Sequence, residues 1–333
     1  MMEQLLNSVP SWTNVAIFFG LGAALLLMVL AFVTYGILAE RKVMGFMQGR
    51  YGPNQVGGRW GLLQTVADVL KLLLKEDTIP KAADRPLFIL APILAFAPAF
   101  MVLAVLPFTD VFQFADIGVG LLYYIAVSGL TTIGVVTGGW ASNNKYALIG
   151  GMRAAAQMIS YEIPLVMSVL GVVLLTGSLN LNDIVEAQKN VWYIFTQPVA
   201  FIVFLIAAVS ELNRTPFDLP EAESELVAGF HVEYSGFRWA FFMLAEYVYL
   251  FAMAALTTIL FLGGWHPIMF LGFIPGPVWF ALKFSVVVFV LIWFRATFPR
   301  LRADQLMELG WKVLFPVALA NIFVTALVKE LFF

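Results

Sequence analysis

The sequence predicts an all-α polytopic membrane protein. Of its 333 residues, 61% are hydrophobic and 12% are charged, and the mean hydropathy is +0.90. Apolar runs long enough to cross a bilayer recur along the whole chain, while the charged residues gather in the connections between them. Because lipid offers no hydrogen-bond partners to the backbone, apolar spans of this length are expected to be helices. A soluble globular domain is excluded.

We expect eight membrane-spanning helices, since a span needs about 20 apolar residues. Pro92 and Pro98 fall inside the second span, which predicts a kinked or broken helix rather than a soluble loop. No internal repeat is evident in the sequence, which weakens any reading as an inverted-repeat transporter. Residues 1–333 are therefore treated as one integral membrane domain. The expected spans are 13–38, 87–108, 118–140, 162–179, 192–210, 239–263, 277–294 and 312–332.

The distribution of Lys and Arg predicts the orientation. The first, third, fifth and seventh connections carry most of the 19 basic residues, eight of them in the first connection alone. The other connections and both tails carry only Lys189 and Lys329. Under the positive-inside rule, the odd-numbered loops face the cytoplasm and both termini face outward. One further base, Lys283, lies inside the seventh span, either as a counter-ion to a buried acid or extended to an interface. Its position near Pro275 and Pro277 favours the interface.

A segment of the first loop, about 60–75, is predicted to lie on the membrane rather than across it. Gln64, Asp68, Lys71 and Lys75 share one helical face, and apolar residues recur at helical spacing on another. A helix of this length extends about 20 Å, too short and too polar to cross a bilayer. A helix buried against a soluble domain is the alternative, but the chain has no room for such a domain. The apolar positions are Leu62, Leu63, Val66, Val69, Leu70 and Leu73.

Acidic residues gather in the fifth loop, 211–237, where Arg214 is the only base before Arg238. Glu162, Glu211 and Glu246 also lie at or within apolar segments, where a carboxylate costs on the order of 3 kcal/mol. Burial favours the protonated form near neutral pH, so a row of such acids can pass protons. The alternative is structural, in which each acid pairs with a base and holds helices together. The acids of the loop are Glu211, Asp218, Glu221, Glu223, Glu225 and Glu233.

Two basic segments flank this acidic loop in the expected topology. The glycine-rich stretch 39–58 contains Arg41 and Arg50, whose guanidinium groups can hold carboxylates or ligand oxygens. The seventh loop contains Arg295, Arg300 and Arg302. Anchoring to anionic lipid is the alternative for the first segment, and an ordinary positive-inside loop is the alternative for the second.

The chain contains no cysteine and only two histidines, His231 and His266. It therefore cannot hold an iron–sulfur cluster or a structural zinc through thiolates. Both histidines fall in loops, where they are poorly placed to ligate a haem within the bilayer. If the protein serves redox chemistry, the electrons come from another chain.

Several stretches match one known family. They are Glu40-Arg-Lys, Gly49-Arg-Tyr-Gly-Pro-Asn, Gly61-Leu-Leu-Gln-Thr-Val-Ala-Asp, Glu211-Leu-Asn-Arg-Thr-Pro-Phe-Asp-Leu-Pro-Glu-Ala-Glu-Ser-Glu-Leu, Ala245-Glu-Tyr and Phe294-Arg-Ala-Thr-Phe-Pro-Arg. They resemble the H subunit of bacterial respiratory complex I, equivalent to subunit 1 of the mitochondrial NADH dehydrogenase. The resemblance covers essentially the whole chain, and its fifth-loop motif is long and specific.

The resemblance implies a subunit of the plasma membrane that binds ubiquinone or menaquinone as substrate. It implies no covalent or metal cofactor in this chain, with iron–sulfur clusters in partner subunits of the peripheral arm and antiporter-like and small membrane subunits alongside. By motif, the residues expected to line the quinone passage are Arg41, Arg50, Asp68, Phe242, Arg295 and Arg300. Those expected to link the passage to the membrane arm are Glu40, Glu162, Glu211, Asp218, Glu221, Glu223, Glu225 and Glu246.

Two alternatives stay open at the level of sequence. One is the equivalent subunit of a related complex fed by hydrogenase or ferredoxin, because the electron donor binds elsewhere. The other is an independent ion transporter. Inspection of the neighbouring genes for cluster-binding and nucleotide-binding subunits would test the first alternative. Transport by this chain alone in reconstituted vesicles would support the second.

Overall fold

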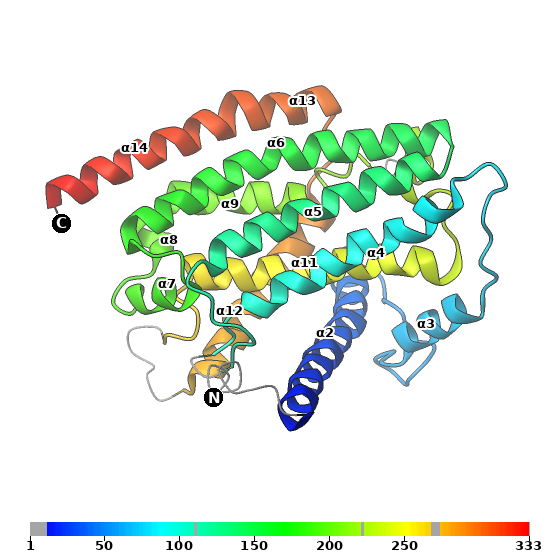
Figure 1. The fold of residues 1–333 in the computed structure, drawn as a ribbon, viewed down its shortest axis with the longest axis horizontal. Helices are drawn as coiled ribbons and strands as arrows, with labels where there is room; N and C mark the ends of the chain where they lie inside the picture. The colour runs from blue at the N-terminus through cyan, green and yellow to red at the C-terminus, as the bar shows by residue number, and fades with distance from the viewer. Residues whose placement is uncertain (1–11, 110–111, 221–222, 268–273, 333) are drawn as a thin grey trace.

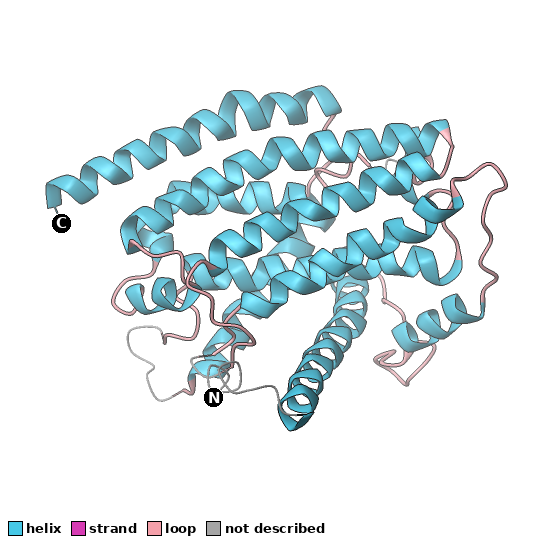
Figure 2. Cartoon of the chain, viewed as in Figure 1, coloured by secondary structure: helices cyan, strands magenta, loops and turns pink. Residues whose placement is uncertain are grey.

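A computed structural model describes residues 12–109, 112–220, 223–267 and 274–332 of the chain. This described part consists of helices and their connecting loops, with no β-strand (Figure 2). Most helices run roughly side by side as a bundle, whereas α2 (Trp12–Met47) is inclined to the others (Figure 1). The all-helical prediction is therefore confirmed.

Helix α11 (Gly236–Phe261) is the centre of the bundle. Its side chains from Val248 onward are buried on all sides, as expected for a helix that is apolar around its circumference. It packs against α4 (Arg85–Met101), α12 (Gly276–Thr297) and α2. Helices α2 and α12 are thus both held against α11.

Helices α4, α5 (Gly120–Ala141) and α6 (Lys145–Thr176) pack closely in succession (Figure 1). A Cβ atom at Gly134 of α5 would lie 2.5 Å from the backbone nitrogen of Ala95, so only glycine permits this approach of α4 and α5. Helix α4 runs through both of its internal prolines and is followed by a 3₁₀ turn, Val102–Val105.

The fifth expected span is broken into two helices in the structure. The short helix α7 (Leu181–Ala187) precedes it, and the span itself, expected at 192–210, is divided into the short helix α8 (Tyr193–Thr196) and α9 (Pro198–Glu211). The break falls at Gln197, because the residue before a proline is disfavoured in the α conformation. In the described residues, seven helices are long and apolar enough to cross a membrane, and α9 is a shorter apolar helix. Eight crossings thus remain a prediction.

The C-terminal segment lies along α6 (Figure 1). It comprises α13 (Ala303–Glu308), a π-helical turn (Leu309–Leu314) and α14 (Phe315–Phe332). The Tyr161 hydroxyl donates to the Leu306 carbonyl at 2.8 Å, and the Tyr161 ring packs against Gly310. The fourth expected span, 162–179, is the second half of α6, which begins at Lys145.

The first loop contains helix α3 (Gln64–Leu74), which packs beside α2 and α11. Its leucines are largely exposed, as are Leu62 and Leu63 before it. The preceding turn requires glycine at position 61, where φ is +66° and a Cβ atom would lie 2.3 Å from the Pro53 carbonyl oxygen. The fifth loop contains the short helix α10 (Glu223–Leu226) and a 3₁₀ turn, Gly229–His231.

Candidate functional site

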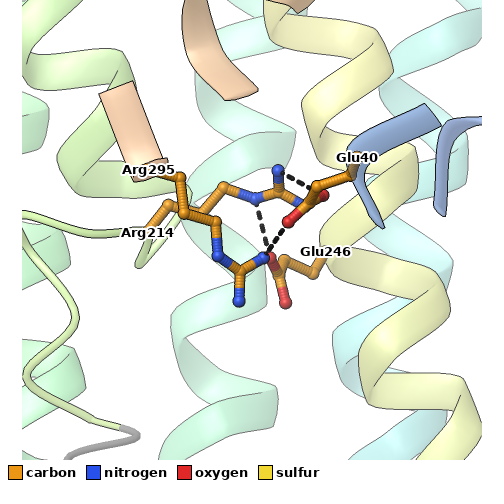
Figure 3. A network of polar contacts seen from close by, with 4 residues as sticks. All are labelled: Glu40, Arg214, Glu246 and Arg295. Atoms are coloured by element: carbon orange, nitrogen blue, oxygen red, sulfur yellow. Dashed lines mark hydrogen bonds and ion pairs between the residues drawn. The ribbon is translucent and has the colours of Figure 1, made fainter. Parts of the chain in front are cut away.

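Four charged residues from four parts of the chain meet in one network, in which Glu40 and Arg214 are buried and Glu246 and Arg295 are partly exposed (Figure 3). Arg214 donates from Nε to Glu246 Oε1 at 2.8 Å and from Nη1 to Glu40 Oε2 at 3.0 Å. Arg295 donates from Nη1 to the other oxygen of Glu40. Two guanidinium groups therefore bracket two carboxylates, and the formal charges cancel.

Each member of the network comes from a different element. Glu40 lies near the C-terminal end of α2, Glu246 lies in the first half of α11, and Arg295 lies in the last turn of α12. Arg214 comes from the loop that follows α9. Arg214 thus ties the end of α2 to the start of α11, and Arg295 ties the end of α12 to α2 through Glu40.

Helix α6 holds the Arg214 loop in place. The side-chain amide of Gln157 donates to the carbonyls of Ser210 at 2.7 Å and Phe217 at 2.8 Å, on both sides of Arg214. Within the turn, Phe217 donates its backbone N–H to the Arg214 carbonyl at 2.8 Å, and Asn213 has a φ of +50°. Asparagine tolerates this left-handed conformation better than most residues. The turn thereby directs the arginine side chain inward.

Arg214 is 2% exposed and Glu40 is 1% exposed, so their charges are shielded from water. Burial by itself would lower the pKa of Arg214, but the carboxylates of Glu246 and Glu40 raise it well above its ordinary value. Its guanidinium also lies 4.8 Å from the centroid of the Tyr247 ring, a cation–π contact. No described residue accepts a hydrogen bond from the Nη2 atom of Arg214.

A cavity extends from this network towards Glu211. About 70 Å³ of it is open to water-sized molecules, and its wall includes Glu246, Glu211, Thr131 and Tyr249. Such a volume has room for more than one water molecule. Carboxyl and hydroxyl groups on its wall supply the polar partners that buried water needs.

Glu211, the last residue of α9, is 7% exposed and has no ion pair among the described residues. It interacts electrostatically with Glu162 of α6 and with the hydroxyl groups of Tyr124 and Tyr249. Glu162 itself packs against Gly129, where a Cβ atom would lie 2.9 Å from its Oε1 atom. Glu246, Glu211 and Glu162 therefore form a series through the bundle, with the cavity between the first two.

The residues predicted for the quinone passage lie in more than one place. Arg41 of α2 and Asp68 of α3 form an ion pair at 2.5 Å, with Arg41 44% exposed. Arg50 is exposed and donates to Gln48 Oε1 at 2.8 Å. Phe242 of α11 is buried on the wall of the cavity, and Arg300 donates to the Asp218 carbonyl in the fifth loop. The structure thus joins Arg295 to the buried network, whereas Arg50 and Arg300 lie apart from it.

The acids of the fifth loop do not form a single cluster. Glu225 is paired with Arg153 of α6 at 2.6 Å, and the hydrogen bond from Arg153 lowers the pKa of Glu225 below its ordinary value. Glu233 accepts from Asn144 at 2.6 Å. Glu221 lies outside the described residues, as does the side chain of Glu223.

His231 lies in the 3₁₀ turn of the same loop and is buried. Burial lowers its pKa to about 4, so the imidazole is neutral near pH 7. Among the described residues, no three His, Asp or Glu side chains are grouped as metal ligands.

Arg214 was not among the candidates derived from the sequence, although it is the residue that joins the network. Its signal was available, because it is the single base inside the acidic loop before Arg238. Tyr249 and Tyr124 were also missed. Tyrosines inside apolar helices are usually packing residues, and only the folded bundle places these two beside Glu211.

The helical bundle and its internal ion pairs define a class, the polytopic membrane proteins that carry ionisable groups in their interior. A family model described as NADH dehydrogenase matches residues 21–326 of the chain. The chain is 92% identical to the H subunit of the NADH-quinone oxidoreductase of Geobacillus sp. (strain WCH70), over the full length of both proteins. It is 87% identical to the protein of the same name from Anoxybacillus flavithermus and 83% identical to that of Bacillus thuringiensis subsp. konkukian, again over both full lengths. The chain belongs to the NADH dehydrogenase family, as its sequence motifs predicted.

Proposed function

We propose that this chain is the quinone-binding membrane subunit of a proton-pumping NADH:quinone oxidoreductase. The observation that carries the proposal is the Arg214 network, which lies at one end of a cavity that leads to Glu211. Support also comes from the names of the relatives described above, which are subunits of an NADH-quinone oxidoreductase. The chain itself supplies binding and charge, while the iron–sulfur clusters that deliver electrons belong to partner subunits.

The quinone passage in this proposal begins at α3, which lies in the cytoplasmic interface of the membrane. The exposed leucines of α3 face lipid, and the Arg41–Asp68 ion pair joins the helix to α2 at the cytoplasmic side. An amphipathic helix in this position borders the region of the bilayer in which an apolar quinone is dissolved. Arg50, Phe242, Arg295 and Arg300 shape the remainder of the passage.

Coupling in this proposal is electrostatic. Reduction of a quinone to a quinol takes up two electrons and two protons, so it changes the charge and the proton demand of the chamber. The ion pairs of Glu40 and Glu246 respond, because charges in a low-dielectric interior interact strongly. Protonation then shifts along Glu246, Glu211 and Glu162 and biases the conformations of antiporter-like subunits. The acids of the fifth loop, Asp218, Glu221, Glu223 and Glu225, connect the chamber to this series.

The placement in the plasma membrane has eight crossings, with the odd-numbered loops cytoplasmic and both termini outside. Partner subunits of the peripheral arm dock on the cytoplasmic loops, and small membrane subunits and antiporter-like subunits lie laterally.

The test measures electron transfer and proton pumping separately in membrane vesicles that contain the assembled complex. We expect Glu211→Gln and Glu246→Gln to lower the number of protons moved per NADH oxidised, because each removes one ionisable group from the series. Glu211→Gln is the cleaner variant, since it breaks no ion pair among the described residues. Glu308→Gln, which changes an exposed acid paired with Lys312, is the matched control and should pump normally. If both site variants assemble and pump at the normal ratio, the acids do not carry the coupling.

A further inference from the structure

A buried lysine lies at the end of α11 that is farther from the charge network. Lys283 of α12 is 5% exposed, although a lysine near a helix start usually extends to water. Its Nζ atom donates to the carbonyls of Leu262 at 2.6 Å, Gly264 at 2.9 Å and His266 at 2.7 Å. All three donor protons of the ammonium are thereby used.

These carbonyls belong to the turn that ends α11. The last carbonyls of a helix lack intrahelical donors and carry the negative end of the helix dipole, which favours a cation. The turn closes over the ammonium because Gly263 and Gly264 both have positive φ, and Trp192 covers the other side with its ring centroid 4.1 Å from Nζ. In the described part of the chain, no carboxylate forms an ion pair with Lys283. The reading of Lys283 as a counter-ion to a buried acid is therefore not supported in this part of the chain, and its position at a membrane interface stays a prediction.

Two cationic side chains of α12 thus hold it to the rest of the molecule. Lys283 holds its first half to the final turn of α11, and Arg295 joins its last turn to Glu40. The two residues are separated by about 18 Å along a continuous helix, because each residue rises about 1.5 Å. A shift of the helix at one contact is therefore transmitted to the other.

We propose that Lys283 is a tethered cation at a three-carbonyl site, and that its charge keeps Arg295 opposite Glu40. Lys283 is in this sense a positioning residue, which acts on the network through α12 without touching it. A carbonyl cage of this kind suits a monovalent cation, so a free ammonium ion takes the position when the tether is removed. The inference rests on the proposed function only for its quinone readout.

The first test removes the charge and keeps the length of the side chain. Lys283→Met is assembled in the complex and compared with Lys329→Met, because Lys329 of α14 also donates to a carbonyl of another helix, that of Leu174. We expect Lys283→Met to lower the midpoint of heat-induced dissociation of the complex. We also expect it to raise KM for quinone several-fold with a smaller change in kcat, while Lys329→Met changes neither. Wild-type behaviour of Lys283→Met, or an equal effect of Lys329→Met, overturns the proposal.

The second test supplies the missing cation. Lys283→Ala leaves the carbonyl site open, so ammonium chloride should restore its dissociation midpoint, whereas an equal concentration of choline chloride should not. If ammonium chloride and choline chloride have the same effect on the dissociation midpoint of Lys283→Ala, the three carbonyls do not form a cation site. If Lys283→Met does not accumulate, Lys283→Arg, which keeps the charge, must accumulate, and loss of both variants also refutes the proposal. Because dissociation is measured without quinone, a negative result here leaves the proposed quinone function standing, and a failure of that function leaves this test intact.

Discussion

Arg214 is a charged side chain in the interior of the molecule, where it has lost its contact with water. It lies in the interior with Glu40 and Glu246 as partners, and a buried ion pair gains stability only when its geometry compensates for the loss of water. The guanidinium suits this position better than an ammonium group because its planar fork donates to two carboxylates from different atoms. Glu40 completes its own hydrogen bonding through Arg295, so removal of Arg214 leaves Glu246 without an ion-pair partner among the described residues.

We therefore expect Arg214→Met to destabilise the subunit by about 3–5 kcal/mol, the usual cost of removing one partner of a buried pair. Arg214→Lys should cost less, because it keeps the charge and loses the fork. The measurement is the amount of assembled complex in membranes and its midpoint of heat-induced dissociation. Arg153→Met, which breaks the exposed pair with Glu225, is the control and should cost at most about 1 kcal/mol. Equal effects of the two methionine variants would show that burial of the pair is unimportant.

At the scale of elements, small residues determine how closely the helices approach. Gly134 brings α5 against the backbone of α4, and the fifth loop meets α6 where Gly150 approaches Gly229. Within a membrane such contacts stabilise helix pairs by van der Waals packing, since lipid provides no hydrophobic force between helices. Helix α9 also follows α6 in the antiparallel direction, from Gln197 beside Gly171 to Ser210 beside Gln157. This packing places Glu211, the last residue of α9, on the wall of the cavity.

A methyl group at position 134 should force α4 and α5 apart. Its Cβ atom would lie 2.5 Å from the Ala95 nitrogen, and backbone cannot move away as a side chain can. We expect Gly134→Ala to cost about 1–3 kcal/mol, as overpacking usually does, and to lower the dissociation midpoint of the complex. Gly22→Ala is the matched control, because a Cβ atom there meets nothing within 4 Å. A midpoint for Gly134→Ala equal to that of Gly22→Ala would contradict this account of the helix crossing.

At the scale of the whole molecule, orientation depends on whether α9 crosses the membrane. If it does, Lys189 and Arg302 face opposite sides, because three crossings separate them; if it does not, they face the same side. The absence of cysteine makes this accessible to single-cysteine labelling. We expect a membrane-impermeant maleimide to label Lys189→Cys from outside and Arg302→Cys from the cytoplasmic side. A permeant maleimide is the control for exposure at each position, and labelling of both from one side would remove α9 from the set of spans.

The sequence motifs and the tertiary structure identified different parts of the candidate site. Glu40, Glu246 and Arg295 were predicted from motifs, and the structure joins them. Their connection through Arg214 was not predicted, because the turn that directs this side chain inward depends on Gln157, more than 50 positions earlier in the chain. The fifth span is a different case, because Gln197 and Pro198 interrupt its apolar pattern in the sequence and the helix breaks there for a local reason. The hydropathy pattern of a segment indicates how apolar the segment is, whereas the length of its helix also depends on local backbone geometry.

By itself, the sequence determined that the chain is helical, that its solvent is a membrane and that its acids gather in one loop. These properties follow from composition and from the order of residues, which are local. Only the tertiary structure decided which charges meet, where the cavity lies between Glu246 and Glu211, and that Lys283 closes the end of α11. Such properties depend on side chains that are distant in sequence, and a buried charge is stable only where the fold brings its partners within hydrogen-bond distance.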